Sequence, residues 1–262
     1  MKKIYLSHMS WPEVKKSVEE NPVILIPIGS TETQNLHNPT GSDYLIAQRL
    51  AEEGAKVANA LICPVLPFGY SEIFKKFPGT ITLRPETLRM VLEDIASSLI
   101  RTGFDHLLFI NNHEPNHAPL GHALDQIREN YGIVCASMWP STLARNFAQD
   151  LFEKPAEVLN HGNEPSTSLL KYLYPELIRT DLIKSCSKPV KLQNFDLVPH
   201  QSLYHQGQNV PIFLQVSDVS KQGGWGKIEG SAEKGKIMFE RMTDFITSFI
   251  KKYRDFNTNI DK

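Results

Sequence analysis

Short apolar runs alternate with amphipathic stretches along the first half of the chain. The runs are rich in β-branched and large aliphatic residues, which is typical of strands buried on both faces of a sheet. They are Val23–Ile28, Ala60–Leu66, His106–Ile110 and Ile133–Met138. Between them lie stretches with apolar residues at helical spacing, namely Asp43–Gly54, Glu86–Gly103 and His117–Tyr131. The recurrence of strand, polar loop and helix predicts an α/β fold with a mostly parallel central sheet.

Two helices are predicted near the ends of the chain. Met9–Glu20 begins with a good N-cap, Ser10, followed by proline and an acid. Ser231–Tyr253 has the length and periodicity of a long helix. From residue 184 to Ser231 the chain has scattered polar residues and no long periodic element, so irregular structure is expected there. No linker, repeat or low-complexity segment divides the sequence, which predicts a single domain over residues 1–262.

Charge and composition exclude several classes of partner. The formal net charge of −1 supplies no basic field for nucleic acid. No run of ~18 apolar residues is present to span a membrane, and the N-terminal lysines lack the apolar segment of a signal peptide. The three cysteines are far apart and odd in number, which argues against a disulfide framework. A cytoplasmic protein that binds neither nucleic acid nor membranes is therefore expected.

Three polar loops concentrate ionisable side chains. Glu32, His37 and Asp43 lie in the loop after the first strand; His113 and Glu114 follow the third strand; His161 and Glu164 precede an apolar helix that starts near Leu169. Ligands of parallel α/β sheets bind beyond the carboxyl ends of the strands. Mixed histidine and carboxylate ligands suit zinc, manganese or iron, and an open coordination position allows such an ion to activate water.

Each loop also has a purely structural interpretation. Asp43 fits a helix N-cap, and Glu164 before Pro165 fits an acid that complements a helix dipole. His113 fits a hydrogen-bonded loop histidine. The residues alone leave a metal or acid–base site and these structural roles as open alternatives.

Five segments, in order along the chain, resemble the creatininase family of creatinine amidohydrolase-like proteins. They are Ile26–Glu32 continuing to His37 and Gly41-Ser42-Asp43; Phe77–Leu83 followed by Glu86-Thr87-Leu88; Asn111–Asn116; His161–Ser168; and Gly223–Gly226 with Ser231–Gly235. The resemblance covers roughly residues 5 to 250. It implies a three-layer α/β/α sandwich and a homo-oligomer, often a hexamer. It also implies a two-metal centre that hydrolyses the C–N bond of a small cyclic or linear amide.

The resemblance also assigns roles by position. Glu32 and His113 would each bind one metal ion, and Asp43 would bridge two. A water between the ions would attack the amide carbon. His161 matches a family histidine near the substrate that is suited to transferring a proton to the leaving nitrogen.

The sequence departs from the family at three expected ligand positions. Gln34 stands where the family has a histidine, and Pro115 and Ser166 stand at the two places where a further acid is found. Glu114, one position from Pro115, and Glu164, two from Ser166, are the nearest acids, and His37 is a possible substitute for the histidine. We therefore assign Glu32, Asp43, His113 and Glu164 as metal ligands, and His161 and Glu114 as catalytic residues.

Two functions follow from these assignments. The first is a metal-dependent amidohydrolase holding one or two zinc, manganese or iron ions. The second is a mononuclear or non-catalytic relative that binds a small ligand or serves as an assembly subunit. Specificity is expected from the loops least like the family, which are Tyr70–Lys76, Glu153–Leu159 and Ser185–Gln208. Trp225 is expected beside the site, either covering substrate or packing, whereas core packing is favoured for Trp139.

Overall fold

The four predicted strands form one parallel sheet in the computed structural model, which describes residues 3–186, 191–198 and 202–260. The strands lie side by side in the order β2-β1-β3-β4. Their bounds are β1 Ile24–Ile28, β2 Leu61–Ile62, β3 Leu107–Asn111 and β4 Ala136–Met138. β1 and β3 are the central pair, so the loops that follow them leave the sheet at the same edge.

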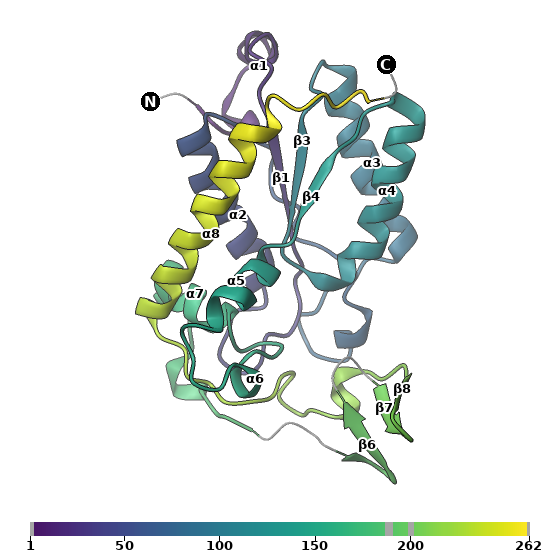
Figure 1. Cartoon of the computed structure of the whole chain (residues 1–262), viewed down its shortest axis with the longest axis vertical. Coiled ribbons are helices and arrows are strands. Elements are labelled where there is room, and N and C mark those ends of the chain that lie inside the picture. Colours follow the sequence, from purple (N-terminus) through teal and green to yellow (C-terminus); the bar gives the residue numbers. More distant parts are fainter. Residues whose placement is uncertain (1–2, 187–190, 199–201, 261–262) are drawn as a thin grey trace.

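Helices cover both faces of this sheet, which explains why its central strands are apolar at every position except Asn111, the last residue of β3. Along β1, Leu25 packs in a core with helices α2 and α8, whereas Ile24 and Ile26 pack in a second core with α3 and α4. These helices span α2 Ser42–Ala58, α3 Pro85–Arg101, α4 His117–Tyr131 and α8 Ala232–Tyr253. Successive strand residues point to opposite faces, so both sets must be hydrophobic. The predicted three-layer α/β/α sandwich is confirmed (Figure 1).

The shorter helices either precede the sheet in the chain or lie around the carboxyl edge of its strands. The α-helices are α1 Trp11–Val18, α5 Pro140–Ala148, α6 Pro155–Val158 and α7 Ser166–Leu173. The 3₁₀ turns are η1 Leu6–His8, η2 Glu72–Phe74, η3 Glu114–Asn116, η4 Pro175–Leu177, η5 Thr180–Leu182 and η6 Val216–Asp218. Ser10 and Glu13 form a capping box at α1, as the N-cap prediction required. Within the described ranges, no helix is both long and apolar enough to cross a bilayer.

The expectation of irregular structure after residue 184 is wrong, because a second sheet lies there. Its strands are antiparallel in chain order: β5 Lys191–Leu192, β6 Phe195–Val198, β7 Ser202–His205 and β8 Gln208–Pro211. The strands are short and largely exposed, so no apolar alternation marks them. Gln206 and Gly207 join β7 to β8 with φ of 46° and 84°, the conformation of a two-residue hairpin, without the usual Asn-Gly pair. Figure 1 shows this sheet at the end of the molecule away from both termini.

Candidate metal and active site

The loop after β1 and the start of α2 approach each other closely. A Cβ atom on Gly29 would lie 2.4 Å from the backbone nitrogen of Tyr44, so only glycine allows this packing. Asn116 fixes the same region, since its Nδ2 donates to the Gly29 carbonyl at 2.9 Å. Asp43, in the first turn of α2, is thereby brought beside the loops that follow β1 and β3.

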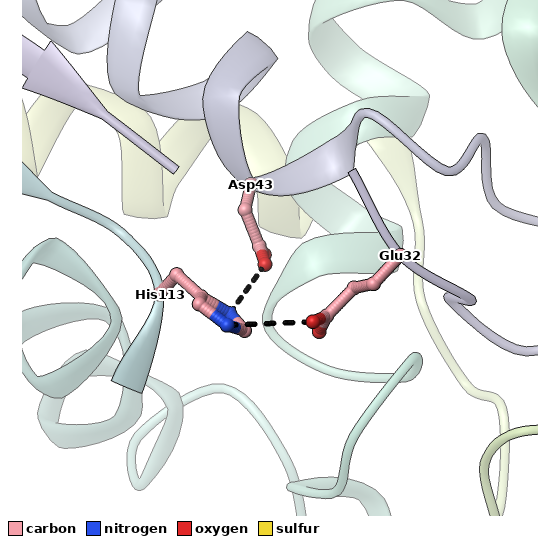
Figure 2. A group of neighbouring side chains, drawn as sticks. All are labelled: Glu32, Asp43 and His113. Atoms are coloured by element: carbon pink, nitrogen blue, oxygen red, sulfur yellow. Dashed lines mark hydrogen bonds and ion pairs between the residues drawn. The ribbon is translucent and has the colours of Figure 1, made fainter. Parts of the chain in front are cut away.

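Glu32, Asp43 and His113 meet at this edge of the sheet (Figure 2). Their potential ligand atoms all lie within 4.8 Å of one another, and all three residues are buried. His113 Nδ1 donates to Asp43 Oδ2 at 3.0 Å, and its Nε2 lies 3.4 Å from Glu32 Oε2. Elsewhere in the described chain, no other group of three such residues comes together. Three of the four predicted metal ligands are thus adjacent.

Neighbouring polar groups hold two members of this cluster in place. Ser30 Oγ donates to Asp43 Oδ2 at 2.6 Å. The His113 backbone N–H donates to Asn111 Oδ1 at 3.2 Å, and its Nε2 donates to the Tyr70 carbonyl at 3.0 Å. The side chain of Asp43 therefore faces the cluster and does not cap α2, whose N-cap is Gly41. Ser30 was not singled out from the sequence; its position two residues beyond β1 was the signal for a supporting role.

Burial and mutual attraction set the charges of the cluster. Burial raises the pKa of Glu32, whose Oε2 has no hydrogen-bond partner. Burial by itself lowers the pKa of His113, but the carboxylates of Glu32 and Asp43 outweigh it and raise the pKa to about 9. The site is therefore a desolvated pair of carboxyl groups beside one imidazolium, and the raised pKa of Glu32 favours its protonated form while no cation other than His113 is present.

A cavity of about 470 Å³ opens above these three residues. Its wall includes the three positions that depart from the family pattern, Gln34, Pro115 and Ser166. Gln34 Nε2 lies 3.4 Å from Glu32 Oε1 and donates to it. Each of the loops expected to set specificity contributes to the wall, through Ile73 and Phe74, Ala156 and Leu159, and Leu197.

His161 enters the cavity from the loop before α7. Its Nε2 lies 2.8 Å from the Thr33 carbonyl and 3.9 Å from Glu32 Oε1, and its ring stacks on Phe74 with centroids 4.2 Å apart. Burial lowers the pKa of His161 to about 4. The imidazole is therefore neutral at physiological pH, with Nε2–H donated to Thr33 and Nδ1 left as a proton acceptor.

The remaining predicted residues lie outside the three-residue cluster. Glu164 is buried and lines the cavity. Its Oε2 also accepts the Ser168 backbone N–H at 3.2 Å, so Glu164 stabilises the start of α7, in agreement with its structural interpretation. Glu114 lines the cavity from η3 and is exposed. His37 Nε2 contacts Thr167 Oγ1 at 2.9 Å, and His37 is not part of the cavity wall. Metal binding by Glu164 and catalysis by Glu114 stay predictions.

Two tryptophans line the cavity. Trp225 lies in the wall and donates its Nε1–H to Asn160 Oδ1 at 3.1 Å. Trp139 is also in the wall, with an edge-to-face contact to His117, so the prediction of core packing needs correction. Trp139 is the N-cap residue of α5, a helix that the sequence pattern did not predict, and its orientation toward the cavity had no signal in the sequence.

Comparison with known proteins gives one consistent result. The family model for creatininase, described as creatinine amidohydrolase, matches residues 7–250. A creatinine amidohydrolase of Pseudomonas putida is 26% identical over 214 residues, covering 76% of this chain and 82% of that protein. A mycofactocin precursor peptide peptidase of Mycobacterium ulcerans is 27% identical over 246 residues, covering 88% and 86%.

Solved structures show the same fold. A creatininase variant of the zinc–zinc type superposes with a TM-score of 0.81 at 23% identity, covering 98% of this chain and 100% of that one. A manganese creatininase superposes with a TM-score of 0.78 at 23% identity, covering 97% and 100%. The three-layer arrangement of this chain therefore has close structural counterparts.

Proposed function

This chain belongs to the creatininase family of hydrolases, and we propose that it cleaves the C–N bond of a small amide with one divalent metal ion held by Glu32, Asp43 and His113. The observation that carries this proposal is the buried cluster of two carboxylates and one imidazole below a cavity. Relatives named for creatinine, an inosose and a peptide as substrates support a hydrolase whose substrate differs between members.

The side chains fit such an ion. Glu32 Oε2 is buried and accepts no hydrogen bond; its cationic neighbour is the His113 ring, with Nε2 3.4 Å away. A buried carboxylate oxygen without a hydrogen bond is costly, and a metal ion would satisfy it. Carboxylate and imidazole donors suit zinc, manganese or iron, and three protein ligands leave coordination positions open. When bound, the ion would lower the pKa of a coordinated water and polarise a carbonyl oxygen. His113 must release a proton to act as a ligand, so affinity should fall in acid.

His161 is placed to handle the proton of the reaction. Its neutral ring accepts a proton from the attacking water while the water oxygen bonds to the amide carbon. It then gives that proton to the nitrogen as the C–N bond breaks. The contacts of His161 with the Thr33 carbonyl and Phe74 keep the ring in one orientation. In this scheme His161 is the general base and acid, and Glu114 at the cavity wall is free to orient substrate.

A single ion is favoured over two by the residue at position 34. Gln34 is a poor metal ligand and instead donates its amide N–H toward Glu32. Glu164, the nearest substitute acid in the loop before α7, has one oxygen committed to the Ser168 backbone.

We also propose a cytoplasmic homo-oligomer. Light scattering after size-exclusion chromatography would test the oligomeric state.

Metal analysis and one substitution test the function together. Protein purified without chelators should hold about one zinc, manganese or iron ion per chain and should hydrolyse a member of a panel of lactams, formamides and cyclic amides. Glu32→Gln should lower both metal affinity and turnover by more than the ~100-fold that loss of an outer-shell partner costs. The control Glu53→Gln, on the surface of α2 beside Lys56, should change neither.

Two results would contradict the proposal. Fewer than about one ion per four chains, without recovery on adding any of the three metals, would favour the non-catalytic relative. Unchanged turnover in Glu32→Gln would remove Glu32 from the site. Two ions per chain, both lost in Glu32→Gln, would contradict the single-ion part alone.

A further inference from the structure

One wall of the cavity is formed by the first turns of α5. Ser141 and Arg145 are four residues apart, so they share one face of the helix, and both line the cavity. Trp139, the N-cap residue, lines it as well. Among the residues that the structure describes, Arg145 is the only lysine or arginine in the wall.

Arg145 lacks the partner that other arginines of the chain have. Arg49 and Arg89 each pair with a glutamate on their own helix, and Arg241 lies 3.5 Å from Asp150. For Arg145, by contrast, the structure over its described ranges gives no ion pair or hydrogen bond, and its buried Nε has no acceptor. An unpaired guanidinium N–H that is shielded from water is unfavourable, so a ligand with an acceptor group would satisfy this wall.

A second unpaired donor lies on the same wall. Trp139 Nε1 is buried and has no hydrogen-bond partner. The cavity lining also holds two buried acceptor atoms without a hydrogen bond, Glu32 Oε2 and Glu164 Oε1. The cavity is thus polarised. Its α5 wall carries unpaired hydrogen-bond donors, and the carboxylates proposed to bind the metal ion carry unpaired acceptors. Burial is the main cause of the low pKa of His161, but the charge of Arg145 also contributes, so the guanidinium lies within electrostatic reach of the reacting end.

We propose that Arg145 binds a carboxylate of the substrate, at the end of the molecule away from the amide bond that is cleaved. This inference rests on the proposed function and names its substrate class, the amides that also carry a carboxylic acid. The planar guanidinium matches a carboxylate in a two-point contact. A single cation among Glu32, Asp43, Glu114 and Glu164 in the cavity wall suits a monoanion better than a doubly charged phosphate.

Matched pairs of small amides test the carboxylate directly. Succinamate, glutaramate and adipamate each differ from the corresponding diamide only by a carboxylate in place of one carboxamide. Calorimetry on chelator-treated protein measures binding without turnover, and initial rates on metal-loaded protein measure hydrolysis. The wild type should bind at least one acid about tenfold or more tightly than its diamide. Arg145→Met should bring that ratio near one, and Arg145→Lys should keep part of it.

Arg101→Met, an arginine exposed at the end of α3, is the control and should keep the wild-type ratio. Thermal unfolding of each variant shows whether it is folded. The inference is overturned if no acid binds at millimolar concentration, if acids and diamides bind equally, or if Arg145→Met keeps the preference. Preferred binding of the acids without hydrolysis after loading with zinc, manganese or iron would contradict the proposed function but support the carboxylate site. Hydrolysis of diamides without preferred binding of the acids would support the proposed function and contradict the carboxylate site.

Discussion

The floor and the cover of the cavity are built in different ways. The floor is Glu32, Asp43 and His113, which lie on the loops after the central strands and in the first turn of α2. It is held by hydrogen bonds with the Ser30 hydroxyl, the Asn111 side chain and the Tyr70 carbonyl. The cover draws side chains such as Leu159, Leu197, Val216 and Trp225 from short elements late in the chain. A rigid sheet edge fixes reacting groups, whereas short surface segments can vary and so change what binds.

The largest contrast between these regions should be in stability. Ile26 is fully buried in β1, whereas Val210 in β8 is 51% exposed. Ile26→Ala should lower the free energy of unfolding by about 2–5 kcal/mol through lost burial and a cavity. Val210→Ala should stay within about 0.5 kcal/mol. Urea unfolding followed by circular dichroism measures both, and equal losses would mean that the second sheet belongs to the cooperatively folded core.

The link between floor and cover should be sensitive to acid. His37 lies in the loop after β1 and contacts Thr167 on α7. Burial, with a smaller contribution from Lys171, lowers the pKa of His37 to about 4. Between the unfolded value of about 6.5 and this value, the unfolded chain binds a proton that the folded chain does not, so stability falls as the pH falls.

His37→Gln should therefore flatten the loss of stability between about pH 6.5 and pH 4, by on the order of 2 kcal/mol after screening by solvent. Denaturant unfolding at a series of pH values measures the slope. His205→Gln, at an exposed position in β7, should leave the slope as in the wild type. An unchanged slope in His37→Gln would show that the pKa of His37 is the same in the folded and the unfolded protein.

The smallest effect should come from the cover itself. Leu197 lines the cavity from β6, and its partner in the ladder, Leu203, does not. Leu197→Ala should raise KM roughly tenfold for the best amide of the panel, with little change in kcat, because it removes apolar contact and no reacting group. Leu203→Ala should change neither constant. A large loss of kcat in Leu197→Ala would mean that the cover also shapes the reacting geometry.

The sequence predicted the sheet and the floor because both depend on local patterns. The strand that becomes β1 is apolar without interruption, since it is covered on both faces, and a polar loop follows it at a fixed place. Family motifs then placed Glu32, Asp43 and His113 on neighbouring loops, and the structure brings these three together.

The cover was not predictable in the same way. Strands β5 to β8 are too short and too exposed to show an alternating pattern. The orientation of Trp139 and Arg145 depends on where α5 packs against loops distant in sequence, which no local spacing records. The sequence did indicate that Glu164 could serve the start of α7, but no local spacing indicates that His161 reaches Glu32.

The unpaired oxygen of Glu32 has a consequence for the life of the protein in a cell. A buried carboxyl oxygen that accepts no hydrogen bond would make the proposed ion a folding ligand as well as a catalytic one, because whatever binds only the native state draws the population toward it by mass action. On the proposed function, the supply of free transition metal would then govern how much of this protein survives quality control, and scarcity would remove the polypeptide together with its activity.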